Sequence, residues 1–315
     1  MTVLFRRILV ALLAPLALAA LVAGCGATGS PVGHPHGTGS ANRGRFAVVA
    51  GENFWGSIAA QLAGDKAVVQ SIIVNPATDP HSYEPNARDA RTVAGAELAI
   101  VNGLGYDNWM GQLLAADQEG GRLVLNVGSA LGLSKGENPH QWYSPTSVYR
   151  IIDRIVTDYD KLDPADSGYF AQRKQNFESE GLARYNQLRQ QIRSKYAGVP
   201  VGYSESIFRP LGEDLGLKLL TPYSFAKAIA EGTDVTAQDK QTVDEQAEHN
   251  QIKVWIYNTQ NATPDVQRIT SIVETHHIPV ATVTETLSPA TASFQQWQTA
   301  QLESLIAALH NATNK

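Results

Sequence analysis

Two short segments of the chain place a histidine directly after a proline and shortly before an aromatic residue and a second proline. Residues 79–85 read DPHSYEP, and residues 138–145 read NPHQWYSP. Proline fixes its own φ and moves the preceding residue out of the helical region, so each turn holds its imidazole on a stiff, irregular backbone. Imidazole is the commonest side-chain ligand of transition metals. One such turn alone favours a capped loop histidine, but two similar turns indicate that His81 and His140 bind a metal.

Two acidic residues further along the chain are candidates to complete such a site. Glu205 lies in the segment GYSESIF at residues 202–208, and Glu285 lies in VTETL at residues 283–287. Each ends an apolar run typical of a buried strand, and ligands of open α/β sheets bind beyond the carboxyl ends of strands. The alternatives are helix capping or plain solvent exposure for Glu205, and an ordinary loop carboxylate for Glu285. Cys25 is the only cysteine, which excludes a thiolate site and an internal disulfide.

Two neutral imidazoles and two carboxylates would neutralise a dipositive ion. Such a mixed nitrogen and oxygen set suits Mn²⁺, Zn²⁺ or Fe²⁺. Bidentate carboxylates would raise the coordination number and favour Mn²⁺ over tetrahedral Zn²⁺, whereas the Irving–Williams order favours Zn²⁺ in vitro. The later histidines lie at a helix end, in a turn and in the terminal helix, and we expect them to be structural: His249, His276, His277 and His310.

The candidate ligands need a scaffold, and the apolar pattern predicts strands that alternate with helices in two similar series. This alternation is typical of mainly parallel sheets with helices on both faces. His81 and His140 follow the second and fourth strands of the first series, and Glu205 and Glu285 end the first and fourth strands of the second. The expected strands are residues 46–50, 68–74, 98–102, 122–127, 199–204, 217–221, 252–258 and 278–284, and the expected helices are 53–63, 86–96, 106–116, 239–250, 264–275 and 293–310.

Residues 147–196, between the two series, carry no strand signal. Apolar side chains recur at helical spacing over residues 166–196 and predict one long helix. At about 1.5 Å per residue, this helix would be roughly 45 Å long. The alternative is a two-helix hairpin bent near Gly181. We therefore expect an N-terminal α/β lobe at residues 46–146, a helical linker at 147–198 and a C-terminal α/β lobe at 199–315.

The N-terminus has the pattern of a bacterial lipoprotein signal. Arg6 and Arg7 precede an apolar run, and small residues precede Cys25. We expect residues 1–24 to be removed and Cys25 to be lipidated; the alternative is an ordinary secretory signal with a spare cysteine. Residues 25–45 are rich in Gly, Ser, Pro and Thr and predict a flexible tether.

The motif DPHSYEP, its continuation AELAIVNGLGYDNW at residues 96–109 and the later NPHQWYSP resemble a known family. They are similar to the metal-binding substrate-binding proteins of ABC importers for zinc and manganese, from about residue 46 to the C-terminus. The resemblance implies an α/β fold of two lobes. Each lobe would hold a mainly four-stranded parallel sheet with flanking helices, and one long helix would join the lobes and limit their relative motion.

The resemblance also implies a ligand set. His81 and His140 match the first two metal ligands of the family. Glu205 matches a third position that is histidine in many zinc importers and glutamate in many manganese importers, whereas Glu285 departs from a position that is usually aspartate. The long His-rich loop common in zinc-specific members is absent. We expect Mn²⁺ or Zn²⁺ as cargo, with the sequence favouring Mn²⁺.

These expectations describe a monomeric, lipid-anchored binding protein on the extracellular or periplasmic face of the cell membrane. It would capture the metal between its lobes and deliver it to an ABC permease without catalysis. The formal charge of −5 and the absence of a basic stripe exclude a nucleic-acid partner. One alternative is a zinc-dependent hydrolase, which needs an open coordination position and a general base. The other is a metal-free surface adhesin, which would leave the two Pro-His turns unexplained.

Overall fold

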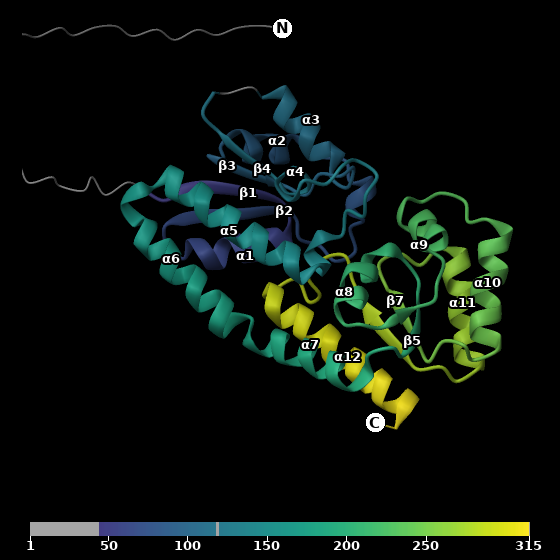
Figure 1. The fold of residues 1–315 in the computed structure, drawn as a ribbon. Coiled ribbons are helices and arrows are strands. Elements are labelled where there is room, and N and C mark those ends of the chain that lie inside the picture. The colour runs from purple at the N-terminus through teal and green to yellow at the C-terminus, as the bar shows by residue number, and fades with distance from the viewer. Residues whose placement is uncertain (1–43, 118–119, 315) are drawn as a thin grey trace, which may run out of the picture. The chain divides into compact units, whose positions relative to one another are not determined.

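The structure, a computed structural model, describes residues 44–117 and 120–314. The expected signal peptide, the expected lipidation site Cys25 and all but the last two residues of the expected tether lie outside these ranges. Within them the chain forms two separate parallel sheets of four strands each, flanked by helices, as expected (Figure 1). Among the helices of the described residues, none combines the length and the apolar character needed to cross a membrane.

The first sheet has the strand order β2-β1-β3-β4. Its inner strands are almost entirely buried, which agrees with their continuous apolar sequence, whereas the edge strand β2 is partly exposed. The strands are β1 (Phe46–Glu52), β2 (Ala67–Ile73), β3 (Leu98–Val101) and β4 (Leu123–Asn126), and the helices are α1 (Asn53–Ala63), α2 (Ala87–Ala94), α3 (Asn108–Ala116) and α4 (Val127–Leu131).

The second sheet repeats this topology with the order β6-β5-β7-β8. In both sheets the direction of winding reverses between the first and the third strand of the series, and ligands of such sheets bind beyond the strand ends at this switch point. The strands are β5 (Pro200–Tyr203), β6 (Lys218–Leu219), β7 (Val254–Asn258) and β8 (Val280–Val283), and the helices are α8 (Arg209–Asp214), α9 (Tyr223–Ala230), α10 (Ala237–Glu248), α11 (Pro264–Thr275) and α12 (Phe294–Thr313).

A helical segment connects the sheets. It comprises α5 (Pro145–Leu162), α6 (Ser167–Asn176) and α7 (Ala183–Tyr196). Between α6 and α7, Phe177–Gly181 forms a single π turn, in which the Leu182 N–H donates to the Phe177 carbonyl at 2.9 Å. The helical path therefore continues in one direction through α6 and α7, and the hairpin alternative is wrong (Figure 1).

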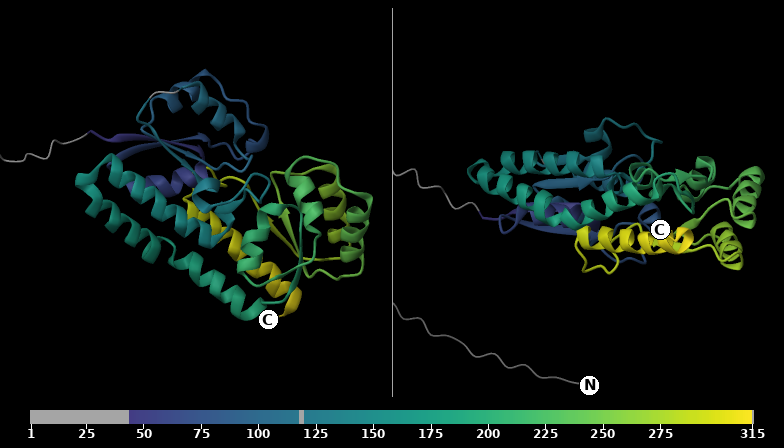
Figure 2. Two further views of the ribbon diagram at one scale, coloured as in Figure 1. Left: turned by 45° about the horizontal axis from the view of Figure 1, so that its top comes forward. Right: turned by 60° about the horizontal axis from the view of Figure 1, so that its bottom comes forward.

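The C-terminal helix α12 ties the second half of the chain to the first. The Phe294 N–H donates to Ser57 Oγ at 2.9 Å, and the Leu287 N–H donates to Asn53 Oδ1 at 3.2 Å. In Figure 2 the yellow helix α12 runs beside α7. One hydrophobic cluster includes Val48 of the first sheet, Val254 of the second and side chains of α5, α7 and α12. Because one apolar core includes residues of both sheets and of the connecting helices, it does not mark where one lobe ends and the next begins. The lobe boundaries expected from the sequence therefore stay predictions.

Every expected strand is present within a few residues, but several elements differ from expectation. The strand expected at residues 217–221 is the two-residue β6. The helix expected from residue 106 begins at Asn108, because the Asp107 carboxylate accepts the N–H groups of Asn102 and Gly103 in the preceding turn. The short helices α4, α8 and α9 were not expected, since a few helical residues are too short for an apolar period to appear.

Candidate metal centre

The structure brings together the side chains of the four residues that the sequence singled out, His81, His140, Glu205 and Glu285. Each offers one nitrogen or oxygen atom, and these atoms all lie within 4.8 Å of one another. Three of the four residues are buried, and His81 is exposed. The two histidines come from the first half of the chain and the two glutamates from the second.

Single 3₁₀ turns hold three of these residues in place. His81 lies inside the turn Pro80–Ser82, His140 directly precedes the turn Gln141–Tyr143, and Glu205 directly precedes Ser206–Phe208. The residue two places before each histidine fixes its turn through a side-chain oxygen. Asp79 accepts the His81 N–H at 2.9 Å, and Asn138 accepts the His140 N–H at 3.0 Å. The likeness of the two sequence motifs thus reflects one local structure, an Asx turn before a histidine.

The hydrogen bonds of His140 orient its imidazole ring. Its Nδ1 lies 2.8 Å from Asn138 Oδ1, whose amide is itself oriented by donation from Nδ2 to the Ser206 carbonyl at 2.8 Å. Nδ1 therefore carries the proton, and the lone pair of Nε2 points into the cluster. Nε2 lies 3.5 Å from Glu205 Oε1 and 3.6 Å from Glu285 Oε2.

Two of the converging atoms lack a hydrogen-bond partner. His140 Nε2 and Glu205 Oε1 are buried and bond to nothing among the residues that the structure describes. An unsatisfied buried polar atom costs about 1–3 kcal/mol, so native structures rarely keep one without a reason. A lone pair of an imidazole and an oxygen of a carboxylate that face the same space are suited to share a cation.

Two further residues, which the sequence analysis did not identify, hold the glutamates. Asn258 Nδ2 donates to Glu205 Oε2 at 2.5 Å and to Glu285 Oε1 at 2.9 Å. The Tyr106 hydroxyl donates to Glu285 Oε2 at 2.9 Å. Asn258 ends β7, and its place at the carboxyl end of an expected strand was the one available signal for it.

Burial and mutual repulsion set the charge of the site. Burial raises the pKa of the Glu285 carboxyl well above its ordinary value, and the nearby Glu205 carboxylate raises it further. Burial also raises the pKa of Glu205 and lowers the pKa of His140 well below its ordinary value. Burial thus disfavours the charged form of all three groups, and a bound cation would offset this for the two carboxylates.

A second carboxyl pair lies next to Tyr106 in the chain and at the end of β1. Glu52 and Asp107 are 0% and 1% exposed. Asp107 accepts the N–H groups of Asn102 and Gly103 at 2.7 Å each, whereas neither oxygen of Glu52 has a partner within the described part of the chain. Burial raises the pKa of Asp107 to about 6. Burial, and then the charge of Asp107, raise the pKa of Glu52 well above its usual range.

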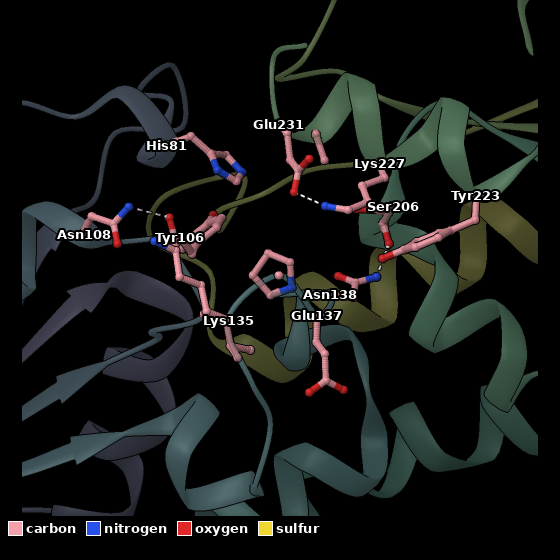
Figure 3. Close-up of a pocket in the computed structure, with 15 residues that line it drawn as sticks. His81, Tyr106, Asn108, Lys135, Glu137, Asn138, Ser206, Tyr223, Lys227 and Glu231 are labelled. Carbon is pink, nitrogen blue, oxygen red and sulfur yellow. Dashed lines mark hydrogen bonds and ion pairs between the residues drawn. The ribbon is translucent and has the colours of Figure 1, made fainter. Parts of the chain in front are cut away.

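Two cavities reach His81 from outside. The first, of about 210 Å³, is lined by His81 and Tyr106 on one side and by the Lys227–Glu231 ion pair on the other (Figure 3). The second, of about 270 Å³, is lined by His81, Glu285 and Gln260 among others. Both cavities thus lead to His81, the exposed member of the four, and the second also reaches Glu285.

Comparison with known proteins gives one family and several relatives. A family model described as "ZnuA: Zinc-uptake complex component A periplasmic" matches residues 48–308. The iron-binding protein YfeA of Yersinia pestis is 28% identical over 185 residues, which cover 55% of this chain and 58% of that protein. The manganese-binding lipoprotein MntA of Halalkalibacterium halodurans is 26% identical over 209 residues, covering 63% of this chain and 65% of its own length. The match thus spans less than two thirds of either relative.

Solved structures agree with the architecture. The periplasmic metal binding protein from Candidatus Liberibacter asiaticus superposes with a TM-score of 0.71 at 20% identity, covering 84% of this chain and 100% of that one. The binding protein FpvC of P. aeruginosa, in complex with Ni²⁺, superposes with a TM-score of 0.69 at 19% identity, covering 86% and 99%. At these identities the similarity establishes the fold.

Proposed function

This chain belongs to the ZnuA family, the periplasmic component A of zinc-uptake complexes, and we propose that it captures a divalent transition metal for an ABC importer. The observation that carries the proposal is the meeting of four donor atoms from both halves of the chain within 4.8 Å of one another. Two buried atoms of these side chains, His140 Nε2 and Glu205 Oε1, have no hydrogen-bond partner among the described residues and are free to bind a cation.

The proposed ligands are His81, His140, Glu205 and Glu285, and the proposed cargo is Zn²⁺ or Mn²⁺. Two imidazoles and two carboxylates form a mixed set that divalent first-row metals accept. The relatives are named for iron, manganese and zinc, which agrees with such a set. Zn²⁺ should bind more tightly than Mn²⁺ in vitro because of the Irving–Williams order, whichever ion is carried in the cell.

The partner and the location follow from the same proposal. We infer that Cys25 carries a lipid anchor on the outer face of the cell membrane and that the loaded protein docks as a monomer on an ABC permease. Two of the relatives are named lipoproteins. Two lobes, at residues 46–146 and 199–315 with the linker 147–198 between them, would close on the ion from both sides.

The same geometry argues against catalysis. A catalytic zinc keeps one coordination position for water and has a general base nearby. Here four protein donors converge, and the carboxyl groups among them are candidate ligands. We therefore propose binding and release without a chemical step, in place of a zinc-dependent hydrolase or a metal-free adhesin.

Isothermal calorimetry on the purified protein tests this function. We expect wild type to bind roughly one Zn²⁺ or Mn²⁺ ion per chain and to unfold at a higher temperature when loaded. We expect His140→Ala and His81→Ala to abolish tight binding. His81→Ala is the safer variant for the fold because His81 is exposed, and His249→Ala, an exposed histidine outside the cluster, is the matched control. Unchanged affinity in both site variants would refute the ligand assignment, and a wild-type protein that binds neither ion would refute the function.

A further inference from the structure

The side chain of Asn258 lies between the two candidate glutamate ligands. Asn258 is fully buried at the end of β7. Its single amide nitrogen donates to both carboxyl groups, to Glu205 Oε2 at 2.5 Å and to Glu285 Oε1 at 2.9 Å. An NH₂ group has two hydrogens, so these two bonds use its full donor capacity.

The surroundings of Asn258 allow only one orientation of this amide. Its Oδ1 accepts the backbone N–H of Gln260 at 3.1 Å, and its own backbone N–H donates to Ser204 Oγ at 2.9 Å. Turning the amide over would place Oδ1 against two carboxyl groups and NH₂ against an N–H donor, which removes every bond it makes.

Two hydrogen bonds of the Gln260 side chain fix the backbone next to Glu285. The Gln260 side chain donates to Thr286 Oγ1 at 3.0 Å and accepts the Thr286 N–H at 3.0 Å. The amide of Asn258 and the backbone that follows Glu285 are therefore held to one another through Gln260.

These bonds divide the four carboxyl oxygens into two kinds. Glu205 Oε2 and Glu285 Oε1 are held by Asn258. The other two, Glu205 Oε1 and Glu285 Oε2, are the ones that lie 3.5 and 3.6 Å from His140 Nε2. One oxygen of each glutamate faces the imidazole of His140, and the other oxygen accepts a hydrogen bond from the Asn258 amide.

We propose that Asn258 is a positioning residue that sets the metal selectivity of the site. By turning one oxygen of each glutamate toward its amide, it fixes both carboxylates so that each presents only its other oxygen to the metal, and the site then offers two nitrogens and two oxygens. Such a set favours tetrahedral Zn²⁺ over Mn²⁺, which prefers octahedral coordination by oxygen-rich ligands. This inference rests on the proposed function, and it reverses the preference for Mn²⁺ that bidentate carboxylates would produce.

Affinities for Zn²⁺ and Mn²⁺, measured separately by competition with chromophoric chelators, test the inference. In Asn258→Leu, a near-isosteric change without donors, both carboxylates are released to bind through two oxygens. We expect the ratio of Zn²⁺ to Mn²⁺ affinity to fall by about tenfold, the lower end of the effect that a residue behind metal ligands has on metal affinity. Asn258→Ser, which keeps a smaller polar side chain, gives the same comparison if the leucine variant does not fold.

Tyr106→Phe is the matched control. It removes a hydrogen bond from Glu285 Oε2, the oxygen that faces His140, and frees no additional oxygen. We expect it to weaken the binding of both ions to a similar extent and to leave the ratio of their affinities unchanged. A purely structural role of Asn258 would produce this same pattern in the Asn258 variants.

The visible absorption of bound Co²⁺ reports the coordination number directly, because four-coordinate Co²⁺ absorbs far more strongly than six-coordinate Co²⁺. We expect strong absorption in wild type and weak absorption in Asn258→Leu. An unchanged ratio with an unchanged spectrum would overturn the inference, and so would a metal-bound wild-type structure in which both glutamates bind through two oxygens. In either case metal binding by wild type would leave the proposed function standing, whereas failure of wild type to bind metal would remove both.

Discussion

Nε2 of His140 lies 3.5 Å from Oε1 of Glu205, and both atoms are buried without a hydrogen-bond partner among the described residues. His140 directly precedes a 3₁₀ turn that leads into α5, and Glu205 follows β5 of the second sheet. The contact therefore joins the two halves of the chain at a point where one cation could accept a lone pair from each atom. This pair is the most direct structural sign of a cation site.

Metal affinity should increase with pH. Burial raises the pKa of Glu205 and Glu285, so both carboxyl groups hold protons more strongly than ordinary glutamates and the ion must compete with those protons. We expect Zn²⁺ affinity to rise from about pH 5 to about pH 7.5, with roughly one proton released per ion bound. Calorimetry in two buffers of different ionisation enthalpy measures the proton count, and His140→Ala supplies the background. Binding without proton release would contradict the charge state assigned to the site.

Glu52→Gln should stabilise the protein at neutral pH but not in mild acid. The folded-state pKa of Glu52 is raised, so its contribution to stability is present below the unfolded pKa and lost as pH rises through the folded pKa. Glutamine removes this loss, and we expect a gain of about 1 to 3 kcal/mol at about pH 7.5 and little change near about pH 4. Urea unfolding at both pH values measures the difference. The exposed Glu84→Gln is the control, and an equal gain at both pH values would disprove the explanation.

Removal of α12 should unfold the whole described unit and not leave a folded first half. A chain that stops before Ser293 loses five large buried apolar side chains, Phe294, Trp297, Leu302, Leu305 and Leu309. At about 1.5–3 kcal/mol each, they contribute roughly 7–15 kcal/mol, which is comparable to the whole stability of a domain. Near-UV circular dichroism and limited proteolysis should show loss of fixed packing, whereas a chain that stops at Thr313 should fold normally. A protease-resistant first half would instead support independent lobes.

Much of the fold was predictable because its signals are local. The strands of both sheets are short apolar runs, and the segment 166–196 carries a helical period that one π turn at Phe177–Gly181 does not interrupt. A carbon added at Gly181 would lie 3.1 Å from the Phe177 ring, which shows how closely that ring packs there. The bonds from Phe294 to Ser57 and from Leu287 to Asn53 were not predictable, because they join residues more than 200 positions apart.

The candidate site also contains residues that the sequence predicts and residues that it does not. The two Pro-His turns repeat a local motif, and Glu205 and Glu285 lie where parallel strands end, so sequence reasoning could select all four residues; their role as ligands stays a prediction. Asn258 carries only the strand-end signal and Tyr106 carries none, and the bonds that give both residues their roles reach glutamates 27 to 179 residues away. Glu52 was missed because it reads as an ordinary polar residue after a strand, and only the fold shows that it is buried beside Asp107.

The uneven burial of the four side chains has a consequence for the loading and release of metal. Three of them are buried, and His81 is the exposed one, on a short turn between prolines. Under the proposed function, loading and unloading can proceed by displacement of that one imidazole while the other three donors keep their positions. The motion of this surface turn would then set the rate of metal exchange, and the buried part of the site would not have to open first.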